Sequence, residues 1–194
     1  MRVLVVAAHP VETSFVAALH RRAIDVLEAG GHAIDDCNLY AESFDPVLSR
    51  QDRLDYHDVA ADRSRIDGYV GRLRSAEALL FVHPVWNFGT PAILKGFLDR
   101  VFLPGVAFNI DAAGNLHPNL GHIRRYGAIC TYGSSRIRAF LAGDPPRRFM
   151  RRGMRGYIPV SRPCSFLACH DMNHTTTERR AAFLRRVERD LGRW

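Results

Sequence analysis

The sequence predicts an α/β fold, a doubly wound five-stranded parallel sheet with helices on both faces. The first reason is a series of short apolar, β-branched runs, a pattern typical of strands covered on both sides. The second is that amphipathic helical patterns separate these runs about once every 30–50 residues, as in right-handed β-α-β units. The 194 residues contain no linker, repeat or low-complexity segment. We therefore expect one domain over residues 1–194.

The N-terminal elements follow one another closely. Residues 3–8 form a continuous apolar run, which predicts the first strand. Residues 15–27 carry apolar side chains at helical spacing, and two glycines beyond them end the predicted helix. Residues 32–39 predict the second strand, and the charged residues 40–58 predict an irregular connection.

The central elements repeat this alternation. A helix is expected over residues 62–75 and a third strand over residues 77–83. A loop over residues 84–90 leads to a helix over residues 91–102, which starts with a proline as helices tolerate. After a longer loop, residues 126–131 predict the fourth strand.

The C-terminal third is less regular. Residues 136–154 predict one or two helical pieces interrupted at Pro145 and Pro146, because proline breaks a helix interior. Residues 166–169 predict a short last strand, and residues 177–191 predict an amphipathic helix.

The composition is that of a globular protein without membrane spans. Hydrophobic residues make up 47% of the chain and charged residues 24%, which excludes a disordered chain. The longest apolar run is far shorter than the ~20 residues of a spanning helix, and it continues into His9 and Pro10 instead of a signal-peptide cleavage site. The four cysteines form no CxxC pair and no zinc spacing. We expect a cytoplasmic protein with reduced thiols.

The net charge of +7 comes from the C-terminal third. Residues 1–135 carry 13 basic and 15 acidic side chains, whereas residues 136–194 carry 14 arginines and 5 acids. Arginine can bind two phosphate oxygens at once, so the basic segment has two interpretations: a solvated basic face or a phosphate-binding site. The chain has no zinc-finger, helix-turn-helix or RNP pattern, so we expect no nucleic-acid partner.

Three loops follow predicted strands at the edge where doubly wound sheets bind ligands, and they span residues 9–15, 84–90 and 131–136. None has a GxGxxG or GxxxxGK[ST] motif, which argues against a Rossmann or P-loop site. The first loop offers His9, Thr13 and Ser14 beside a helix N-terminus, where hydroxyls and main-chain N–H groups bind phosphate. A plain helix N-cap explains the same residues equally well.

The loop over residues 84–90 is the most unusual of the three. It places Trp86, Asn87 and Phe88 between two prolines, directly after a buried strand. A rigid loop with aromatic faces and free main-chain polar groups suits a flat heteroaromatic ring.

Longer stretches of the chain share a recognisable pattern. They read AHPVETSF at residues 8–15, NLYA at 38–41, FDPVLS at 44–49, PVWNFGTPAILKGFLDRVF at 84–102 and GVAF at 105–108. This pattern resembles the DT-diaphorase family of flavodoxin-like NAD(P)H:quinone oxidoreductases. The resemblance is good over residues 1–135, and beyond them only His174 and Thr175 fit.

The resemblance implies a flavin at the strand ends. The residues near its phosphate-bearing tail would be His9, Thr13, Ser14 and Phe15. Those lining its isoalloxazine ring would be Pro84, Val85, Trp86, Asn87 and Phe88. Those meeting the ring from the other side would be Thr131, Tyr132, Gly133 and Ser134.

The resemblance also implies an activity. Hydride would pass from NAD(P)H to flavin N5 and then to a quinone or related acceptor in the same pocket, with ping-pong kinetics. The expected cofactor is FAD, with FMN as the alternative. A homodimer is expected, with the apolar helix faces near residues 62–75 and 91–102 as its contact.

The chain departs from the family pattern where mammalian members carry a Tyr and a His for charge relay. Residues 136–146 contain neither residue type. The candidate catalytic groups are therefore Tyr132, whose offset differs, and Arg136 or Arg138, whose permanent charge can stabilise the reduced flavin. A solvated basic helix start is the alternative for the two arginines.

Two other functions are alternatives to an oxidoreductase. One is a flavin-binding regulatory subunit of a membrane transporter, and another is a flavodoxin-like electron carrier, against which the basic C-terminal third argues. No metal site is expected, because the histidines do not fall at ligand spacings. His83 is expected at the surface or at a cap.

Overall fold

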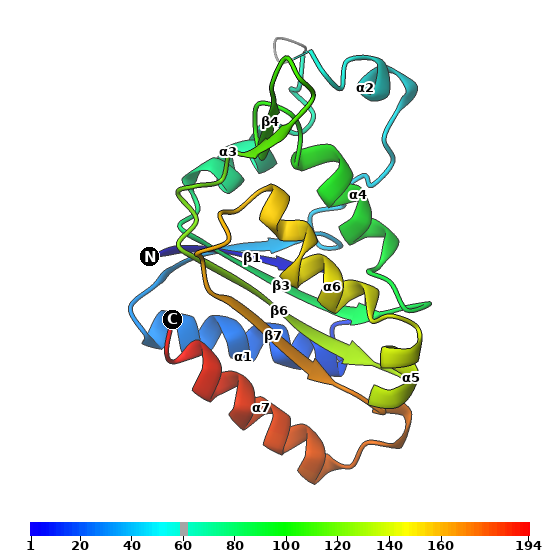
Figure 1. Ribbon diagram of the computed structural model, residues 1–194. Coiled ribbons are helices and arrows are strands. Elements are labelled where there is room, and N and C mark those ends of the chain that lie inside the picture. The colour runs from blue at the N-terminus through cyan, green and yellow to red at the C-terminus, as the bar shows by residue number, and fades with distance from the viewer. Residues whose placement is uncertain (59–61) are drawn as a thin grey trace.

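Figure 1 shows the computed structural model, which describes residues 1–58 and 62–194. Its main sheet has five strands in the order β2-β1-β3-β6-β7, and every neighbouring pair is parallel. The strands are β1 (Arg2–Ala7), β2 (Ala33–Asn38), β3 (Ala78–Val85), β6 (Arg125–Tyr132) and β7 (Cys164–Cys169). The predicted doubly wound sheet is confirmed.

Helices cover both faces of this sheet (Figure 1). On one face lie α1 (Phe15–Ala29) and α7 (Thr177–Leu191), and on the other lie α3 (Asp67–Ser75), α4 (Ala92–Val101) and α6 (Pro145–Arg151). Alternate residues of β1 serve the two sides: Val3 and Val5 join the core under α1 and α7, whereas Leu4 and Val6 join the other core. Both cores explain the continuous apolar runs in the sequence.

Two short elements lie where the sequence predicts only irregular chain. The first is α2 (Arg50–Leu54), whose start is a capping box made by Ser49 and Asp52. The second is an antiparallel hairpin of β4 (Phe108–Ile110) and β5 (Leu116–Pro118). Both are too short and too polar to leave a periodic apolar pattern.

Several predicted boundaries are shifted. The helix expected from residue 62 begins at Asp67, and β3 continues through Pro84 and Val85, which were expected in a loop. The basic segment contains two helices, α5 (Arg136–Leu141) and α6, and the latter starts at the proline pair. Two 3-10 turns follow, Gly153–Gly156 and Met172–His174.

The helix faces expected to form a dimer contact are used inside the chain. Val70 and Leu73 of α3 and Leu94 and Phe97 of α4 are buried in one core cluster. These side chains are therefore not free for a contact between subunits, and the expected dimer contact stays a prediction. Helical periodicity identifies an apolar face, but the sheet of the same chain already covers it. Within the described residues, no helix is long and apolar enough to cross a membrane.

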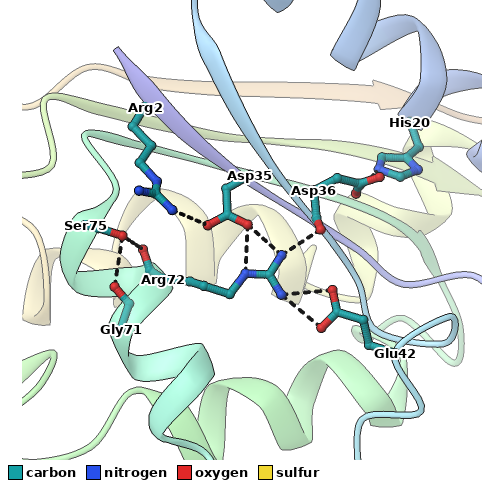
Figure 2. A network of polar contacts seen from close by, with 8 residues as sticks. All are labelled: Arg2, His20, Asp35, Asp36, Glu42, Gly71, Arg72 and Ser75. Atoms are coloured by element: carbon teal, nitrogen blue, oxygen red, sulfur yellow. Dashed lines mark hydrogen bonds and ion pairs between the residues drawn. The ribbon is translucent and has the colours of Figure 1, made fainter.

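Arg72 of α3 fastens the edge strand β2 to the rest of the fold (Figure 2). Its Nε donates to Asp35 Oδ1 at 2.8 Å, its Nη1 donates to both Glu42 carboxylate oxygens at 2.8 and 2.9 Å, and its Nη2 donates to the main-chain oxygen of Asp36 at 2.6 Å. Arg2 binds the other oxygen of Asp35 at 3.3 Å. The network fixes β2 and the segment after it.

Replacing Arg72 with methionine is expected to lower the free energy of unfolding by about 2–3 kcal/mol, since charge-assisted hydrogen bonds are lost and Asp35 stays partly buried. Urea unfolding measures the change. The matched control is Arg74→Met on the exposed side of the same helix, which should cost well under 1 kcal/mol. Equal midpoints for the two variants would contradict a clamp at Arg72.

Candidate functional site

The strand order reverses between β1 and β3. From β1 the chain moves to β2 on one side and then returns to β3 on the other. In open α/β sheets such a point, at the carboxyl ends of the strands, is where ligands bind. The loops after β1, β3, β6 and β7 follow one another along this edge, which the strand arrowheads in Figure 1 mark beside α5.

The chain after β3 forms a strained aromatic turn. Trp86 and Gly89 exchange main-chain hydrogen bonds at 3.1 and 2.8 Å, and Asn87 and Phe88 between them have φ of 48° and 59°. Two positive φ angles give a type I′ hairpin turn, which Asn accepts readily and Phe rarely. Trp86 and Phe88 are each 42% exposed. A bulky residue held in this conformation, with its ring in solvent, points to a functional role.

His9 brings the first two loops together. Its ring centroid lies 5.9 Å from that of Trp86, and its Nδ1 accepts a hydrogen bond from the main-chain N–H of Val11 at 3.0 Å. The imidazole is therefore oriented by its own loop and held against the aromatic turn. The structure thus joins the predicted phosphate-binding loop to the predicted ring-binding loop.

The remaining residues of the first loop divide between capping and packing. Ser14 is the N-cap of α1, and its hydroxyl oxygen accepts from the Ala17 N–H at 3.1 Å. Its hydroxyl hydrogen can still be donated to an anion. The Phe15 ring packs 6.5 Å from that of Phe183 in the core between α1 and α7. Of these residues, Thr13 is exposed at the helix N-terminus.

His83 is not at the surface, as the sequence had suggested, but buried within β3 beside the aromatic turn. Its Nδ1 donates to the Pro84 carbonyl oxygen at 2.9 Å, so its Nε2 is left to accept from the Cys130 thiol at 3.3 Å. Burial lowers the pKa of His83 to about 4. A neutral imidazole therefore joins β3 to β6 directly behind the site.

The buried His83 predicts a pH effect on stability. In the unfolded chain the imidazole takes up a proton near pH 6.5, whereas the folded chain keeps it neutral down to about pH 4. The free energy of unfolding should therefore fall as the pH drops from about 6.5 to about 4, by about 2–3 kcal/mol from this residue. Urea titrations across that window measure it. In His83→Gln the fall should be smaller; parallel pH profiles would refute this assignment.

The third loop follows buried residues and is held by hydrogen bonds from Tyr132 and Arg147 to Asp144, together called the Asp144 clamp. Thr131 and Tyr132 pair with Pro84 and Val85 at the end of β6, and burial covers Tyr132 almost completely. Its hydroxyl donates to Asp144 Oδ1 at 2.6 Å.

The clamp continues from Asp144 to the next helix. Asp144 Oδ2 accepts from Arg147 Nε at 2.7 Å, which ties the start of α6 to the end of β6. Burial, followed by the hydrogen bond from its own hydroxyl to Asp144, raises the pKa of Tyr132. Its phenol is thus engaged within the protein, which makes it a positioning group for the 133–144 segment. The catalytic role expected for its hydroxyl stays a prediction.

A fourth loop, after β7, lies against the third. The Asp171 N–H donates to the Ser134 carbonyl at 3.0 Å, and the Asn173 amide lies over Gly133, 3.5 Å from where a Cβ would be. The His170 ring stacks 4.4 Å from that of Tyr132, and both of its ring nitrogens are buried without a partner among the described residues. The only sequence signal for this loop was the His174–Thr175 pair, so its other members were missed.

Helix α5 carries the two candidate arginines and an exposed apolar surface. Arg136 and Arg138 are exposed and make no ion pair within the described chain. Between and beyond them Ile137, Phe140 and Leu141 are 72%, 76% and 77% exposed. Large apolar side chains on a surface mark contacts with ligands or other molecules. The helix therefore presents positive charge and apolar area at the same edge of the sheet as the aromatic turn, after the neighbouring strand.

Comparison with known proteins agrees with this geometry. A family model described as "Flavodoxin-like fold" matches residues 1–190. NAD(P)H dehydrogenase [quinone] 1 of Cavia porcellus is 33% identical over 127 residues, which cover 57% of this chain and 46% of that protein. The chain spans about half of the length of the curated relatives it matches. The first of them, the ribosyldihydronicotinamide dehydrogenase-like protein traD of Penicillium crustosum, is covered over 63% of its length.

Solved structures share the fold. NAD(P)H:quinone oxidoreductase from Methanothermobacter marburgensis superposes with a TM-score of 0.85 at 22% identity, over 99% of this chain and 98% of that one. An FMN-dependent NADH-azoreductase from Bacillus anthracis, solved in complex with FMN, superposes with a TM-score of 0.78 at 16% identity, over 99% and 98% of the two chains. At these identities the likeness concerns the fold.

Proposed function

The chain belongs to the flavodoxin-like fold family, and on that premise we propose that it is a flavin-dependent NAD(P)H:quinone oxidoreductase. The observation that carries the proposal is the strained turn Trp86–Gly89 at the switch point of the sheet. A turn that exposes two aromatic rings and main-chain groups at this edge suits a planar heteroaromatic cofactor. The names of its relatives support the same activity.

A bound flavin would supply a ring that takes hydride from NAD(P)H and passes it to an acceptor. The chain's own residues do the rest. Trp86 and Phe88 give an aromatic wall and Thr13 and Ser14 offer hydroxyls at the α1 N-terminus, where the helix dipole favours phosphate. Because the aromatic turn is one open face, donor and acceptor use it in turn, which gives ping-pong kinetics.

The finer assignments are part of the same proposal. The cofactor is FAD, with FMN as the alternative, and mass spectrometry of the released flavin distinguishes the two. The acceptor is a quinone or related compound, and the protein acts as a homodimer in the cytoplasm, where its four free thiols stay reduced. With the α3 and α4 faces buried, α5 offers the exposed apolar side chains for a dimer contact.

Arg136 and Arg138 are proposed to stabilise the negative charge that develops when hydride arrives. Each is replaced by glutamine separately, and NADPH-driven flavin reduction is followed by stopped flow. At least one variant should be slower by about tenfold, because a permanent charge beside the ring is lost. Arg148→Gln on the exposed side of α6 is the matched control. Unchanged rates in both variants would assign the two arginines to a solvated surface.

The proposed function is tested on purified protein. Under anaerobic conditions NADH or NADPH should bleach the flavin absorbance, and a benzoquinone should restore it with many turnovers. A regulatory subunit would instead give slow turnover and co-purify with a membrane partner. A coloured protein that neither reductant bleaches would contradict the oxidoreductase assignment.

A further inference from the structure

A groove extends from the aromatic turn along helix α4. It has a volume of about 290 Å³ and lies between α4 and α6, two helices on the same face of the sheet (Figure 1). Gly89 and Thr90 line its near end, and Phe102, the C-cap of α4, lines its far end. Because the groove follows α4 from its start to its C-cap, it is about 15 Å long. The groove is therefore elongated, and the aromatic turn forms one end of it.

The walls of the groove are apolar and already formed. Leu98 of α4 and Phe149 of α6 pack against the core and stay partly exposed where they line the groove. At the far end the Phe102 ring, which is 2% exposed, lies 5.3 Å from the Tyr157 ring between centroids. The Asp144 clamp holds the start of α6, whose two prolines form one edge of the groove. A ligand can therefore enter without a rearrangement of the fold.

The charges among the described residues that line the groove are balanced. Lys95 and Asp99 form an ion pair with each other, and both side chains are partly exposed. Burial raises the pKa of the Tyr56 and Tyr157 hydroxyls, so both phenols stay neutral. A multiply charged ligand such as a nucleotide gains no counter-charge from these walls. A hydrocarbon chain, in contrast, is removed from water by aliphatic and aromatic side chains.

We propose that the groove binds the hydrocarbon chain of a lipophilic quinone whose ring reacts at the aromatic turn. The proposal rests on the proposed function for the choice of a quinone. The continuity of the groove with the turn supports the rest, because Gly89 lines the groove and also exchanges main-chain hydrogen bonds with Trp86. One molecule can thus place its ring at Trp86 and its chain along α4. NAD(P)H carries no such chain, so the groove would serve the acceptor alone.

The first test compares 1,4-benzoquinones that differ only in one substituent, which is methyl, butyl or hexyl. They serve as acceptors for the purified protein with NADPH as donor. The kcat/KM for the quinone should rise with chain length, by about tenfold or more from methyl to hexyl, since each buried methylene favours binding. Equal kcat/KM values for the three quinones would overturn the proposal.

Variants of Leu98 locate the effect in the groove. Leu98→Asn places a polar amide in the wall, and it should remove most of the gain from the chain while the methyl quinone and NADPH keep their kcat/KM. Leu98→Trp fills the groove with an apolar side chain and should remove the same gain, so the test does not depend on how well Leu98→Asn folds. The matched control is Leu184→Asn, at a partly exposed leucine of α7 on the opposite face of the sheet, which should keep the full preference.

The simpler explanation is that a second copy of the chain covers the groove. It predicts that the Leu98 variants change the oligomeric state, measured by size-exclusion chromatography with light scattering, and leave the preference for the hexyl quinone as it is. An undiminished preference in either folded Leu98 variant would overturn the proposal.

A binding measurement separates this proposal from the proposed function. The methyl and hexyl quinones are titrated into the purified protein by calorimetry without NAD(P)H, so that no turnover takes place. The hexyl quinone should bind about tenfold or more tightly than the methyl quinone in the wild-type chain, and with little difference in Leu98→Asn. A protein that shows this difference but reduces neither quinone would count against the proposed function alone. Equal binding of the two quinones to the wild-type chain would overturn the groove as a chain-binding site, whatever the activity.

Discussion

A Trp86→Ala variant should fold and yet purify with little or no flavin. The indole is 42% exposed, so its loss removes only part of a buried contact from the fold. In a complex it would supply the stacking face, and stacking of a nucleobase on an aromatic side chain is worth about 1–3 kcal/mol. We therefore expect the dissociation constant of the flavin to rise about tenfold or more. Titration of the flavin-free variant with FAD and FMN, followed by flavin fluorescence, measures it.

The matched variant for this experiment is Trp86→Phe, which keeps an aromatic face at the same place. It should retain most of the flavin affinity, whereas a steric or folding effect would impair both variants alike. Unchanged flavin affinity in Trp86→Ala would mean that the aromatic turn is not the ring-binding wall.

The second large effect is expected from Asp144→Ala. Asp144 accepts from the Tyr132 hydroxyl at 2.6 Å and from Arg147 at 2.7 Å, and its own side chain is 13% exposed. Its removal leaves a buried phenol without a partner, so the free energy of unfolding should fall by about 2–4 kcal/mol. Because the pair closes the segment that carries α5, flavin reduction by NADPH should slow as well. Urea unfolding and stopped-flow absorbance measure the two effects.

Tyr132→Phe separates the parts of this prediction. It removes the hydroxyl and keeps the ring against His170, so about 1 kcal/mol of stability should be lost. If the phenol transferred protons directly, this variant would lose activity without losing stability. A fully stable Asp144→Ala variant with normal reduction rates would show that the clamp does not position α5.

The sequence predicted the main sheet because its strands are covered on both faces. Runs such as residues 3–8 have to be apolar at every position, and such runs are visible without knowledge of their neighbours. The 177–191 helix was predicted with its observed bounds, since one apolar stripe marks it, whereas its Thr176 cap is known only from the structure. The hairpin of Phe108–Ile110 with Leu116–Pro118 was not predicted, because strands of three residues are too short to show an alternating apolar pattern.

The candidate site was predicted where chemistry lies in adjacent residues and missed where it lies between distant ones. Trp86, Asn87 and Phe88 stand out as a block, although their positive φ angles do not. The pairing of His20 with Asp36, 16 residues apart, depends on how α1 crosses the sheet. The hydrogen bond of the Tyr132 hydroxyl likewise depends on Asp144, which is distant in the sequence. Burial of His83 was missed because a lone histidine has no pattern.

The proposed function depends on a flavin bound against the Trp86–Gly89 turn. The most direct measurement is the titration of flavin-free protein with FAD and FMN, read by quenching of flavin fluorescence, with Trp86→Ala beside it. We predict saturable binding of at least one flavin to the wild-type chain and about tenfold or more weaker binding to the variant. Fluorescence that neither flavin loses on mixing with the folded wild-type protein would contradict it.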